Sequence, residues 1–393
     1  MKIAYACRSS WHWVFKEAFE GAGKDFRDVR VVKSLRLLRK EFGADCGQRK
    51  GPSTFSFATT TTNDDGEAVG TSTIYTGDSE VFEDLEDKDD FVRSVTEAGA
   101  EAFIVESTLI DFNFHLQSSQ ALALPSIPAV FKTPMGSCGN GIHFVSSVEE
   151  VLALIAENYN LVSEDENILE SIQASKGRIP QFVLQKEVRS RLLDGRKFHL
   201  RTYVLAIERG EGIDIFLYVR EHEVRAAKER VEEIYGDDER EDLIRNRAAH
   251  ITNGASGATR RLLLRNVEEL CGLKGKVEIF VADFLRKMQG IMAKKIVCDG
   301  CEQKFGLAAV DVMCNVNNLL AILEVNAYPA APGKEGLFGG EGETDEEGMF
   351  FSKHLVRLGL DLFNFVSRAS PTEAEVSRDD EGGNVSFVNI MVL

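Results

Sequence analysis

Hydrophobic and polar residues alternate along several short segments of the first hundred residues, and this period of two predicts β-strands. Other segments repeat their apolar residues every three or four positions, as amphipathic helices do. Strands are expected at residues 3–6, 29–32 and 102–106, and helices at residues 14–22, 35–42 and 91–98. This alternation of strands and helices is typical of a small α/β unit.

Strand patterns become more frequent after residue 127. Strands are expected at residues 128–132, 142–145, 182–188, 199–207, 215–219, 308–314 and 320–325, and helices at 147–158, 229–247, within 267–295 and at 350–367. The last two strands alternate like an antiparallel pair, and Ser147 with Glu150 fits a helix capping box. The predicted class is therefore α/β, of the α+β kind, with an antiparallel sheet in its C-terminal part.

Shifts in composition divide the chain of 393 residues, 44% of them hydrophobic, into four parts. Residues 1–126 are expected to form an N-terminal α/β domain, with a mobile Thr-, Gly- and Asp-rich insertion at about residues 51–90. Residues 127–190 are expected to form a central lobe, residues 191–367 a C-terminal lobe and residues 368–393 a flexible tail. A chain of this length can bury several apolar cores.

Charge and hydropathy exclude several classes of protein. The net charge of −17 disfavours binding to nucleic acid or to an anionic membrane surface. Apolar runs such as residues 319–323 are far shorter than the roughly 20 residues of a membrane span. No signal-peptide pattern precedes the first strand, and the 7 scattered cysteines indicate a reducing compartment. We therefore expect a cytoplasmic protein, with free thiols rather than zinc at Cys298 and Cys301.

Three polar side chains interrupt the last two apolar strands. Glu324 and Asn326 lie two residues apart and so share a strand face, and Asp311 is expected to face the same side from the neighbouring strand. Carboxylate and amide oxygens are ligands that Mg²⁺ prefers. Acidic residues are poor strand formers and are costly to bury. A metal site therefore explains them better than a solvated strand does.

A glycine-rich loop follows Lys132 in the sequence VFKTPMGSCGNGIHFV. Gly136, Gly139 and Gly141 would let the backbone fold over an anion, and Lys132 would reach a phosphate. The loop leads into a strand and contains no GK[ST], so it is neither a dinucleotide fingerprint nor a Walker A loop. An ordinary tight turn is the alternative.

Two strands between these segments carry polar residues in a regular pattern. The apolar strand FVLQKEV contains Gln185 and Lys186, and its backbone would pair with an adenine edge. In RKFHLRTYVL, the residues Lys197, His199 and Arg201 alternate, so they share one face and suit a polyphosphate. The alternative for each segment is an ordinary strand with a structural histidine.

Two further groups are less specific. Arg225 follows the segment IFLYVREHEV and would place a guanidinium on a phosphate or a carboxylate. The segment HITNG carries His250, Thr252 and Asn253 at an expected loop or strand end. Taken alone, each of these residues is more often structural than catalytic.

In their order along the chain, these motifs resemble those of the tubulin–tyrosine ligase-like family of the ATP-grasp superfamily. The family pattern contains a Lys with a G-x-G-I loop, a strand ending in Gln-Lys and an R-K-F-[DH]-[LI]-R strand. An Arg after the next strand, an H-[LI]-T-N segment and a D…E-V-N pair follow. All six occur here in that order, within residues 127–330. The resemblance implies an ATP-grasp fold preceded by a small α/β N-terminal domain.

The resemblance also implies an ATP- and Mg²⁺-dependent ligase that forms an amide bond through an acyl phosphate. The implied nucleotide contacts are Lys132, Gly139, Gly141, Ile142, Gln185, Lys186, Lys197 and His199, the implied metal ligands are Asp311, Glu324 and Asn326, and Arg201, Arg225 and Asn253 would line the γ-phosphate and acceptor site. The implied partners are a free amino acid and tubulin or another protein with an acidic tail, which would bring the enzyme to the cytoskeleton.

The sequence departs from the family pattern at three places. His199 stands where many members have Asp, Cys138 stands where several have a basic or polar residue, and residues 1–126 do not match the domain that recognises tubulin in the founding ligase. Two alternatives therefore stay open: an ATP-grasp ligase for a small molecule or a non-tubulin protein, and a nucleotide-binding pseudoenzyme with a scaffolding role. If the substrate is an acidic tail, the basic segment from Arg189 to Arg201 would receive it.

Overall fold

The computed structural model describes residues 2–7, 11–21, 28–31, 55–60, 73–76, 80–114, 128–134, 141–163, 178–209, 212–227, 229–231, 252, 259–295, 303–327, 329–332, 345–368 and 386–392. The strands are β1 (Lys2–Cys7), β2 (Asp28–Val31), β3 (Phe55–Thr60), β4 (Thr73–Thr76), β5 (Ser107–Asp111), β6 (Ala129–Lys132), β7 (Ile142–Val145), β8 (Gln181–Lys186), β9 (Leu192–Leu193), β10 (Arg196–Arg209), β11 (Gly212–Tyr218), β12 (Glu223–Ala227), β13 (Thr259–Leu263), β14 (Gln303–Cys314), β15 (Leu320–Asn326) and β16 (Phe387–Val392). The helices are α1 (His12–Gly21), α3 (Lys88–Glu97), α4 (Val148–Ser163), α8 (Lys274–Lys287), α9 (Gln289–Met292) and α10 (Asp345–Arg368). Short 3₁₀ helices are η2 (Glu83–Leu85), η3 (Glu101–Phe103), η5 (Leu264–Asn266), η6 (Glu268–Leu273) and η7 (Ala293–Lys295).

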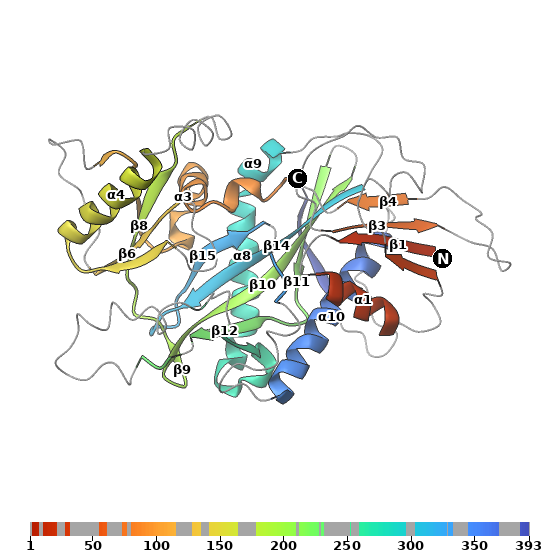
Figure 1. Ribbon diagram of the computed structural model, residues 1–393. Coiled ribbons are helices and arrows are strands. Elements are labelled where there is room, and N and C mark those ends of the chain that lie inside the picture. Colours follow the sequence, from red (N-terminus) through yellow and green to blue (C-terminus); the bar gives the residue numbers. More distant parts are fainter. Residues whose placement is uncertain are drawn as a thin grey trace.

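Two sheets organise the described part of the chain (Figure 1). The larger one has 12 strands and runs in the order β13-β12-β10-β14-β4-β3-β1-β2, with β15 also paired to β14 and β11 to β10. The smaller one has 4 strands in the order β5-β8-β6-β7 and lies with α4 at the opposite end of the molecule from β1 and α1. The α+β class is therefore confirmed at the level of a mixed fold with mainly antiparallel sheets.

The long strands β10 and β14 form the centre of the larger sheet. They pair antiparallel from Leu200 opposite Val312 to Ile207 opposite Phe305. Their side chains alternate between two faces, and both faces are covered, so the strands are apolar on both sides over most of their length.

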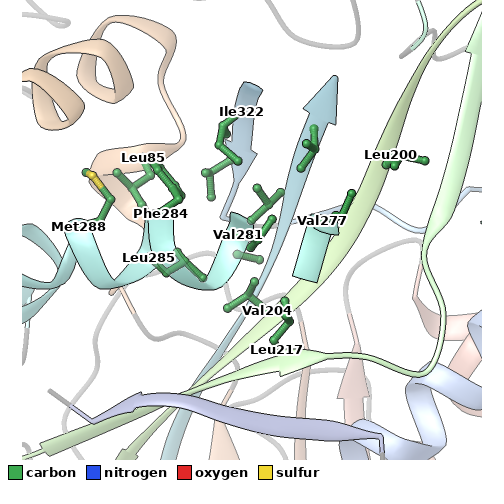
Figure 2. Packing of buried hydrophobic residues seen from close by; sticks show 14 of the residues in the cluster. Leu85, Leu200, Val204, Leu217, Val277, Val281, Phe284, Leu285, Met288 and Ile322 are labelled. Carbon is green, nitrogen blue, oxygen red and sulfur yellow. The ribbon is translucent and has the colours of Figure 1, made fainter. Parts of the chain in front are cut away.

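One face of this sheet packs against α8 and α3 (Figure 2). Val277, Val281 and Phe284 recur at helical spacing on α8 and meet Leu200 and Val204 of β10. Each of these side chains is 0% exposed. Burying a side chain of this size contributes on the order of 1.5–3 kcal/mol to the free energy of folding. The packing of α8 against this face therefore stabilises the sheet.

The other face packs against α1 and α10. Trp11 lies at the start of α1, is 1% exposed, and donates its indole N–H to the Pro329 carbonyl at 2.6 Å. Phe19 of α1 meets Phe363 of α10 edge to face, with ring centroids 5.0 Å apart. The close approach of the helices explains Gly359, because a Cβ there would lie 2.9 Å from Val14 Cγ1.

The smaller sheet has a core of its own, in which Phe131 and Phe182 pack beneath α4. The expected cap of α4 is present in part, since the Glu150 backbone N–H donates to Ser147 Oγ at 3.2 Å. The Glu150 carboxylate instead accepts from the Ser146 backbone N–H at 2.7 Å. The two reciprocal bonds therefore involve two serines rather than one.

Several predicted elements differ from the structure. Residues 102–106 are not a strand: Gly99 at φ +62° ends α3, the chain then turns through η3, and the strand β5 comes after it. The region 51–90 contains β3 and β4, so it is not wholly a mobile loop. The residues at 387–392 are not a flexible tail, because β16 pairs with β11. The helices expected at 35–42 and 229–247 lie outside the described residues, apart from residues 229–231.

The predicted boundary at residue 127 passes through the smaller sheet, because β5 pairs with β8. Across the described helices, none combines the length and the apolar character that a membrane crossing requires.

Candidate functional site

A cleft lined by both apolar and charged side chains lies where the two sheets face each other. It has a volume of about 140 Å³ and is lined from both sides. The smaller sheet and the segment after it contribute Lys132, Ile142, Phe144 and residues 185–188, and the larger sheet contributes Lys197, Phe198, His199, Asp311, Met313, Leu323 and Glu324. Most residues that sequence motifs pointed to therefore lie around one cleft, although they come from segments as far apart as residues 132 and 324.

A row of charged residues crosses three strands at the cleft, and two of its members, Asp311 and Glu324, line the cleft. Arg201 of β10 lies directly opposite Asp311 of β14, and Asp311 lies opposite Glu324 of β15. Paired residues of antiparallel strands point to the same face, so the expected placement of Asp311 and Glu324 is confirmed. A register shift follows Asp311, between it and Val312. Bulges of this kind re-aim side chains next to sites.

Arg201 holds Asp311 in a bidentate ion pair. Its Nε donates to Asp311 Oδ1 at 2.7 Å and its Nη2 donates to Oδ2 at 2.6 Å. The two residues are 3% and 1% exposed. Burial alone would raise the pKa of Asp311, but the charge of Arg201 outweighs it and holds the pKa below its ordinary value. Asp311 is thus a carboxylate at any working pH.

Asn326 links the two carboxylates. Its Nδ2 lies 3.3 Å from Asp311 Oδ2 and 3.3 Å from Glu324 Oε1. Burial and then the negative charge of Asp311 raise the pKa of Glu324. Two carboxylates that repel each other in a buried place are what a divalent cation would stabilise.

Asp311, Glu324 and Asn326 carry the oxygen ligands that Mg²⁺ prefers, but they do not form a preformed coordination site. Within the described ranges, no three His, Cys, Asp or Glu side chains are grouped so as to hold a metal ion. Both oxygens of Asp311 accept hydrogen bonds from Arg201. A cation at Asp311 therefore requires the guanidinium of Arg201 to release at least one of these oxygens.

Lysines approach the same cleft from both sheets. Burial lowers the pKa of Lys132 to about 8, against the attraction of Glu324, and Lys88 lowers it further. Burial also lowers the pKa of Lys88, again opposed first by Glu324. Lys197 lies 3.0 Å from the Glu187 carboxylate, and its ammonium stands 5.5 Å from the centre of the Phe144 ring. These cations favour an anionic ligand.

The segment after β8 forms one wall of the cleft. Gln185 is 6% exposed and donates from Nε2 to Ser107 Oγ at 3.1 Å, while Lys186 lies 3.6 Å from the Glu106 carboxylate at the rim. The backbone N–H of Lys186 donates to Glu106 O, and that of Glu187 to Pro128 O. These two N–H groups are thus used within the protein rather than left for an adenine edge.

His199 lies deep in the cleft. Its Nδ1 is 2.6 Å from Thr252 Oγ1, and its Nε2 is 3.6 Å from Asp311 Oδ1. Burial lowers its pKa to about 4, so the imidazole is neutral. Thr252 of the HITNG motif therefore lies at the site, whereas His250 and Asn253 lie outside the described residues.

The glycine-rich loop is described at its C-terminal end alone. Gly141 has a φ of +69° and accepts a hydrogen bond from Thr133 N–H at 2.8 Å, which closes the β6–β7 hairpin. Ile142 follows it into the cleft. Gly136, Cys138 and Gly139 lie outside the described residues.

Arg225 does not follow a strand, as the sequence predicted, but lies within β12. Its Nε and Nη2 donate to Glu223 Oε2 at 3.0 and 2.8 Å. Glu223 is 0% exposed and also accepts from the Tyr203 hydroxyl at 2.7 Å. Arg225 is therefore anchored by a buried carboxylate that the sequence motifs did not single out.

The basic segment from Arg189 to Arg201 is not one continuous surface. Arg191 donates to Asn318 Oδ1 at 2.8 Å and to the Glu269 carbonyl at 2.7 Å, so it secures the turn between β14 and β15. Arg196 reaches the Ala227 carbonyl at 3.5 Å. The two arginines thus contact different parts of the protein, and the binding of an acidic tail by this segment stays a prediction.

Sequence patterns missed Lys88, Glu223 and Tyr203. Lys88 lies within an acidic run, so its charge looks like part of a solvated helix. Glu223 and Tyr203 look like ordinary strand residues. The signal in the sequence was the run of polar residues at 220–223 followed by Arg225, of which Glu223 and Arg225 lie on β12, a strand buried along its whole length.

The cleft is smaller than ligand sites usually are, since those measure roughly 300–1,000 Å³. A larger hollow of about 470 Å³ adjoins the cleft, since residues 186–188 and Met313 line both, and another of about 620 Å³ lies beside β13. A ligand too large for the cleft alone has room in the adjoining hollow.

Neither the models of protein families nor the curated protein sequences with which this chain was compared gave a match.

Proposed function

We propose that this chain is an ATP- and Mg²⁺-dependent carboxylate–amine ligase with an ATP-grasp fold, similar to the tubulin–tyrosine ligase-like enzymes. The observation that carries the proposal is the convergence of Lys132, Lys197, Asp311 and Glu324, from four different strands, on one cleft between two sheets. Phosphoryl transfer depends on cations and metal-binding carboxylates positioned around the phosphates. Burying these lysines and carboxylates together costs stability, and phosphoryl transfer is a function that needs them in one place.

In this proposal the nucleotide lies between the sheets. Ile142, Val188 and Met313 line the cleft as apolar walls for a base, and Lys132 and Lys197 hold phosphates. Mg²⁺, held by Asp311, Glu324 and Asn326, would neutralise charge on the phosphates. Because the N–H groups of Lys186 and Glu187 are already bonded, carbonyl groups of this segment are the better partners for an adenine amino group.

In this proposal Arg201 binds Asp311 before the nucleotide arrives and the phosphates afterwards. In the structure it binds Asp311 through both carboxylate oxygens. A triphosphate offers the guanidinium more negative charge than one carboxylate does. With Arg201 turned towards the phosphates, Asp311 would be able to hold Mg²⁺ together with Glu324 and Asn326, and the ion would supply charge neutralisation. Arg225 would then lie on the acceptor side and orient the carboxylate that is activated.

The proposed substrates are a free amino acid, as the amine, and a protein with an acidic tail, with tubulin as the first to test. A cytoplasmic enzyme associated with the cytoskeleton would meet both. The chain departs from the family in its first 126 residues, so a non-tubulin protein or a small molecule is the alternative acceptor.

The proposal is tested by incubating the protein with tubulin, Mg·ATP and a mixture of isotope-labelled amino acids, followed by peptide mass spectrometry. The wild type is expected to add one labelled amino acid or more to an acidic tail, and Glu324→Gln is expected to add none. Asp283→Asn, an exposed position on α8, is the matched control and should act as the wild type does. ATP consumption without a tubulin adduct would move the acceptor to the non-tubulin alternative.

One observation favours a second candidate, a nucleotide-binding scaffold without transfer activity. Arg201 already neutralises Asp311, so this carboxylate is paired without a metal. Such a protein would bind ATP with equal affinity in the presence of Mg²⁺ or of EDTA. The ligase would lose most of its ATP affinity in EDTA.

A further inference from the structure

The hollow of about 470 Å³ continues the cleft on the side away from its carboxylates. Val105, Val188 and Met313 line both spaces, whereas Asp311 and Glu324 line the cleft and not the hollow. Beyond Met313, the wall of the hollow is formed by residues 315–317 and 319–321, where β14 turns into β15. A ligand that lies in the cleft can therefore extend past Met313 into the hollow.

Apolar side chains form most of this outer wall. Val316 and Leu319 are 48% and 64% exposed, and Ile104, Leu320 and Ala321 line the hollow with them. Single exposed apolar residues are ordinary on a protein surface, whereas a group of them around a hollow is typical of a ligand-binding surface.

The charged side chains of the hollow are mostly paired. Lys186 lies 3.6 Å from the Glu106 carboxylate, and Glu187 lies 3.0 Å from the Lys197 ammonium. The remaining charged side chain of the lining, that of Arg189, is exposed to water. The apolar wall is thus the surface that a ligand would cover, and it favours an apolar group.

Hydrogen bonds within the turn between β14 and β15 hold this wall in place. Asn315 Oδ1 accepts from the backbone N–H groups of Asn317 and Leu319, each at 2.9 Å. Arg191 donates to Asn318 Oδ1 at 2.8 Å from the segment after β8. The hollow is therefore preformed, and a ligand need not order the turn in order to bind.

The reacting groups of the proposed ligase do not meet in the hollow. Its part beyond Met313 lies roughly 7 Å or more from Asp311, because Met313 comes two residues later on β14. Reacting atoms need to approach to about 3–3.5 Å. The occupant of the hollow is therefore a part of the nucleotide that takes no part in the chemistry.

The base is the part of the nucleotide that reaches the hollow. In the proposed function it lies against Val188 and Met313, which line both spaces. The amino group of adenine has two hydrogens, and only one is needed to donate to a carbonyl of residues 186–188. An apolar substituent in place of the other hydrogen would enter the hollow. A cavity of about 150 Å³ holds a benzene ring, so the hollow has room for a phenyl group.

We propose that this hollow is an extension of the nucleotide site, which accepts purine nucleotides with an apolar substituent on the amino group of the base. The inference rests on the proposed function, since it takes the position of the base from it. Ala321 lies directly opposite Met313 on the neighbouring strand, so the two side chains face the same side. The small side chain of Ala321 keeps the hollow open and determines this specificity.

The test is calorimetric titration of the full-length protein, in the presence of Mg²⁺, with ATP and with ATP that carries a benzyl group on the amino group of its base (benzyl-ATP). The wild type is expected to bind benzyl-ATP no more than about threefold more weakly than ATP. Ala321→Phe should weaken benzyl-ATP binding about tenfold or more and ATP binding less than about threefold, because its ring fills the space that the benzyl group needs. The matched control, Ala293→Phe at an exposed position on η7, should change neither affinity.

Folding of each variant is measured by circular dichroism. If Ala321→Phe does not fold, Leu319→Asn takes its place, with Ile279→Asn on α8 as its control, since the two side chains are 64% and 66% exposed. Leu319→Asn removes apolar contact and should weaken benzyl-ATP binding about threefold relative to ATP.

Two results would overturn the inference: a wild type that binds ATP but binds benzyl-ATP more than about tenfold more weakly, or an Ala321→Phe variant that loses affinity for both nucleotides equally. ATP binding by the wild type would leave the proposed function standing in both cases. A folded wild type that binds neither nucleotide would remove the proposed function and this inference together.

Discussion

The two halves of β10 differ in what covers one and the same face of the strand: polar side chains cover it in the first half and apolar side chains in the second. Towards its N-terminal end, Lys197, His199 and Arg201 meet Glu187, Thr252 and Asp311. Towards its C-terminal end, Leu205 and Ile207 pack in the core beneath α1 and α10.

Burial is nearly the same in both halves. Arg201 is 3% exposed and Leu205 is 0% exposed. The apolar half follows from the hydrophobic effect, whereas the polar half removes charges from water at a cost that pairing offsets only in part. Stability therefore explains the apolar half, whereas the polar half fits the ligand-binding function proposed above.

The largest effect is expected from removing the ion pair between Arg201 and Asp311 in the polar half of β10. Asp311→Asn leaves the buried guanidinium of Arg201 without a counter-charge, and we expect the free energy of unfolding to fall by about 3–5 kcal/mol in urea denaturation. Replacing both residues, as Arg201→Met with Asp311→Leu, should restore most of that stability while nucleotide binding is lost. A double variant as unstable as Asp311→Asn would show that the ion pair is needed for the fold, contrary to the comparison.

The apolar half is tested with Leu205→Ala. The side chain is 0% exposed, and its truncation should lower the free energy of unfolding by about 2–5 kcal/mol. Because Leu205 lies away from the cleft, Mg·ATP affinity should be unchanged at temperatures where the variant is folded. A parallel loss of affinity would mean that the two halves are coupled.

The pH dependence of nucleotide affinity tests whether the charge of Lys132 contributes to binding. Burial lowers the pKa of Lys132 to about 8, so the free side chain is charged below this pH and loses its proton above it. Nucleotide affinity should therefore fall about tenfold between pH 7 and pH 9. Lys132→Arg stays charged over this range, so its affinity should vary little, and an equally steep fall in this variant would assign the dependence to another group.

The smallest effect is expected at an exposed ion pair. Asp283 and Arg286 lie 2.7 Å apart on α8 with about half of each side chain exposed. Asp283→Ala should change the free energy of unfolding by less than about 1 kcal/mol, because water already solvates both charges. A change as large as that of Asp311→Asn would remove the distinction between buried and exposed pairs.

Local patterns in the sequence predicted a good part of this arrangement. The alternation in β10 and the pairing of β14 with β15 are short-range features, and the structure confirms both. The Ser147 cap of α4 is local too. Each depends on residues within a few positions or on strands joined by a short turn.

Long-range pairing could not be predicted in this way. The contact of Arg201 with Asp311 joins residues 110 positions apart, and it depends on the register of β10 against β14. The addition of β16 to the sheet and the approach of Lys88 to the cleft depend on the packing of distant segments. No period in the sequence encodes which strands become neighbours.

The central claim is that the cleft between the two sheets binds Mg·ATP through the carboxylates of β14 and β15. The most direct test is calorimetric titration of Mg·ATP into the wild type and into Glu324→Gln, which keeps the shape of the side chain and removes its charge. We expect the wild type to bind the nucleotide and the variant to lose about tenfold or more in affinity. A folded wild type that does not bind the nucleotide, or a variant that binds it equally well, would rule out the proposed site.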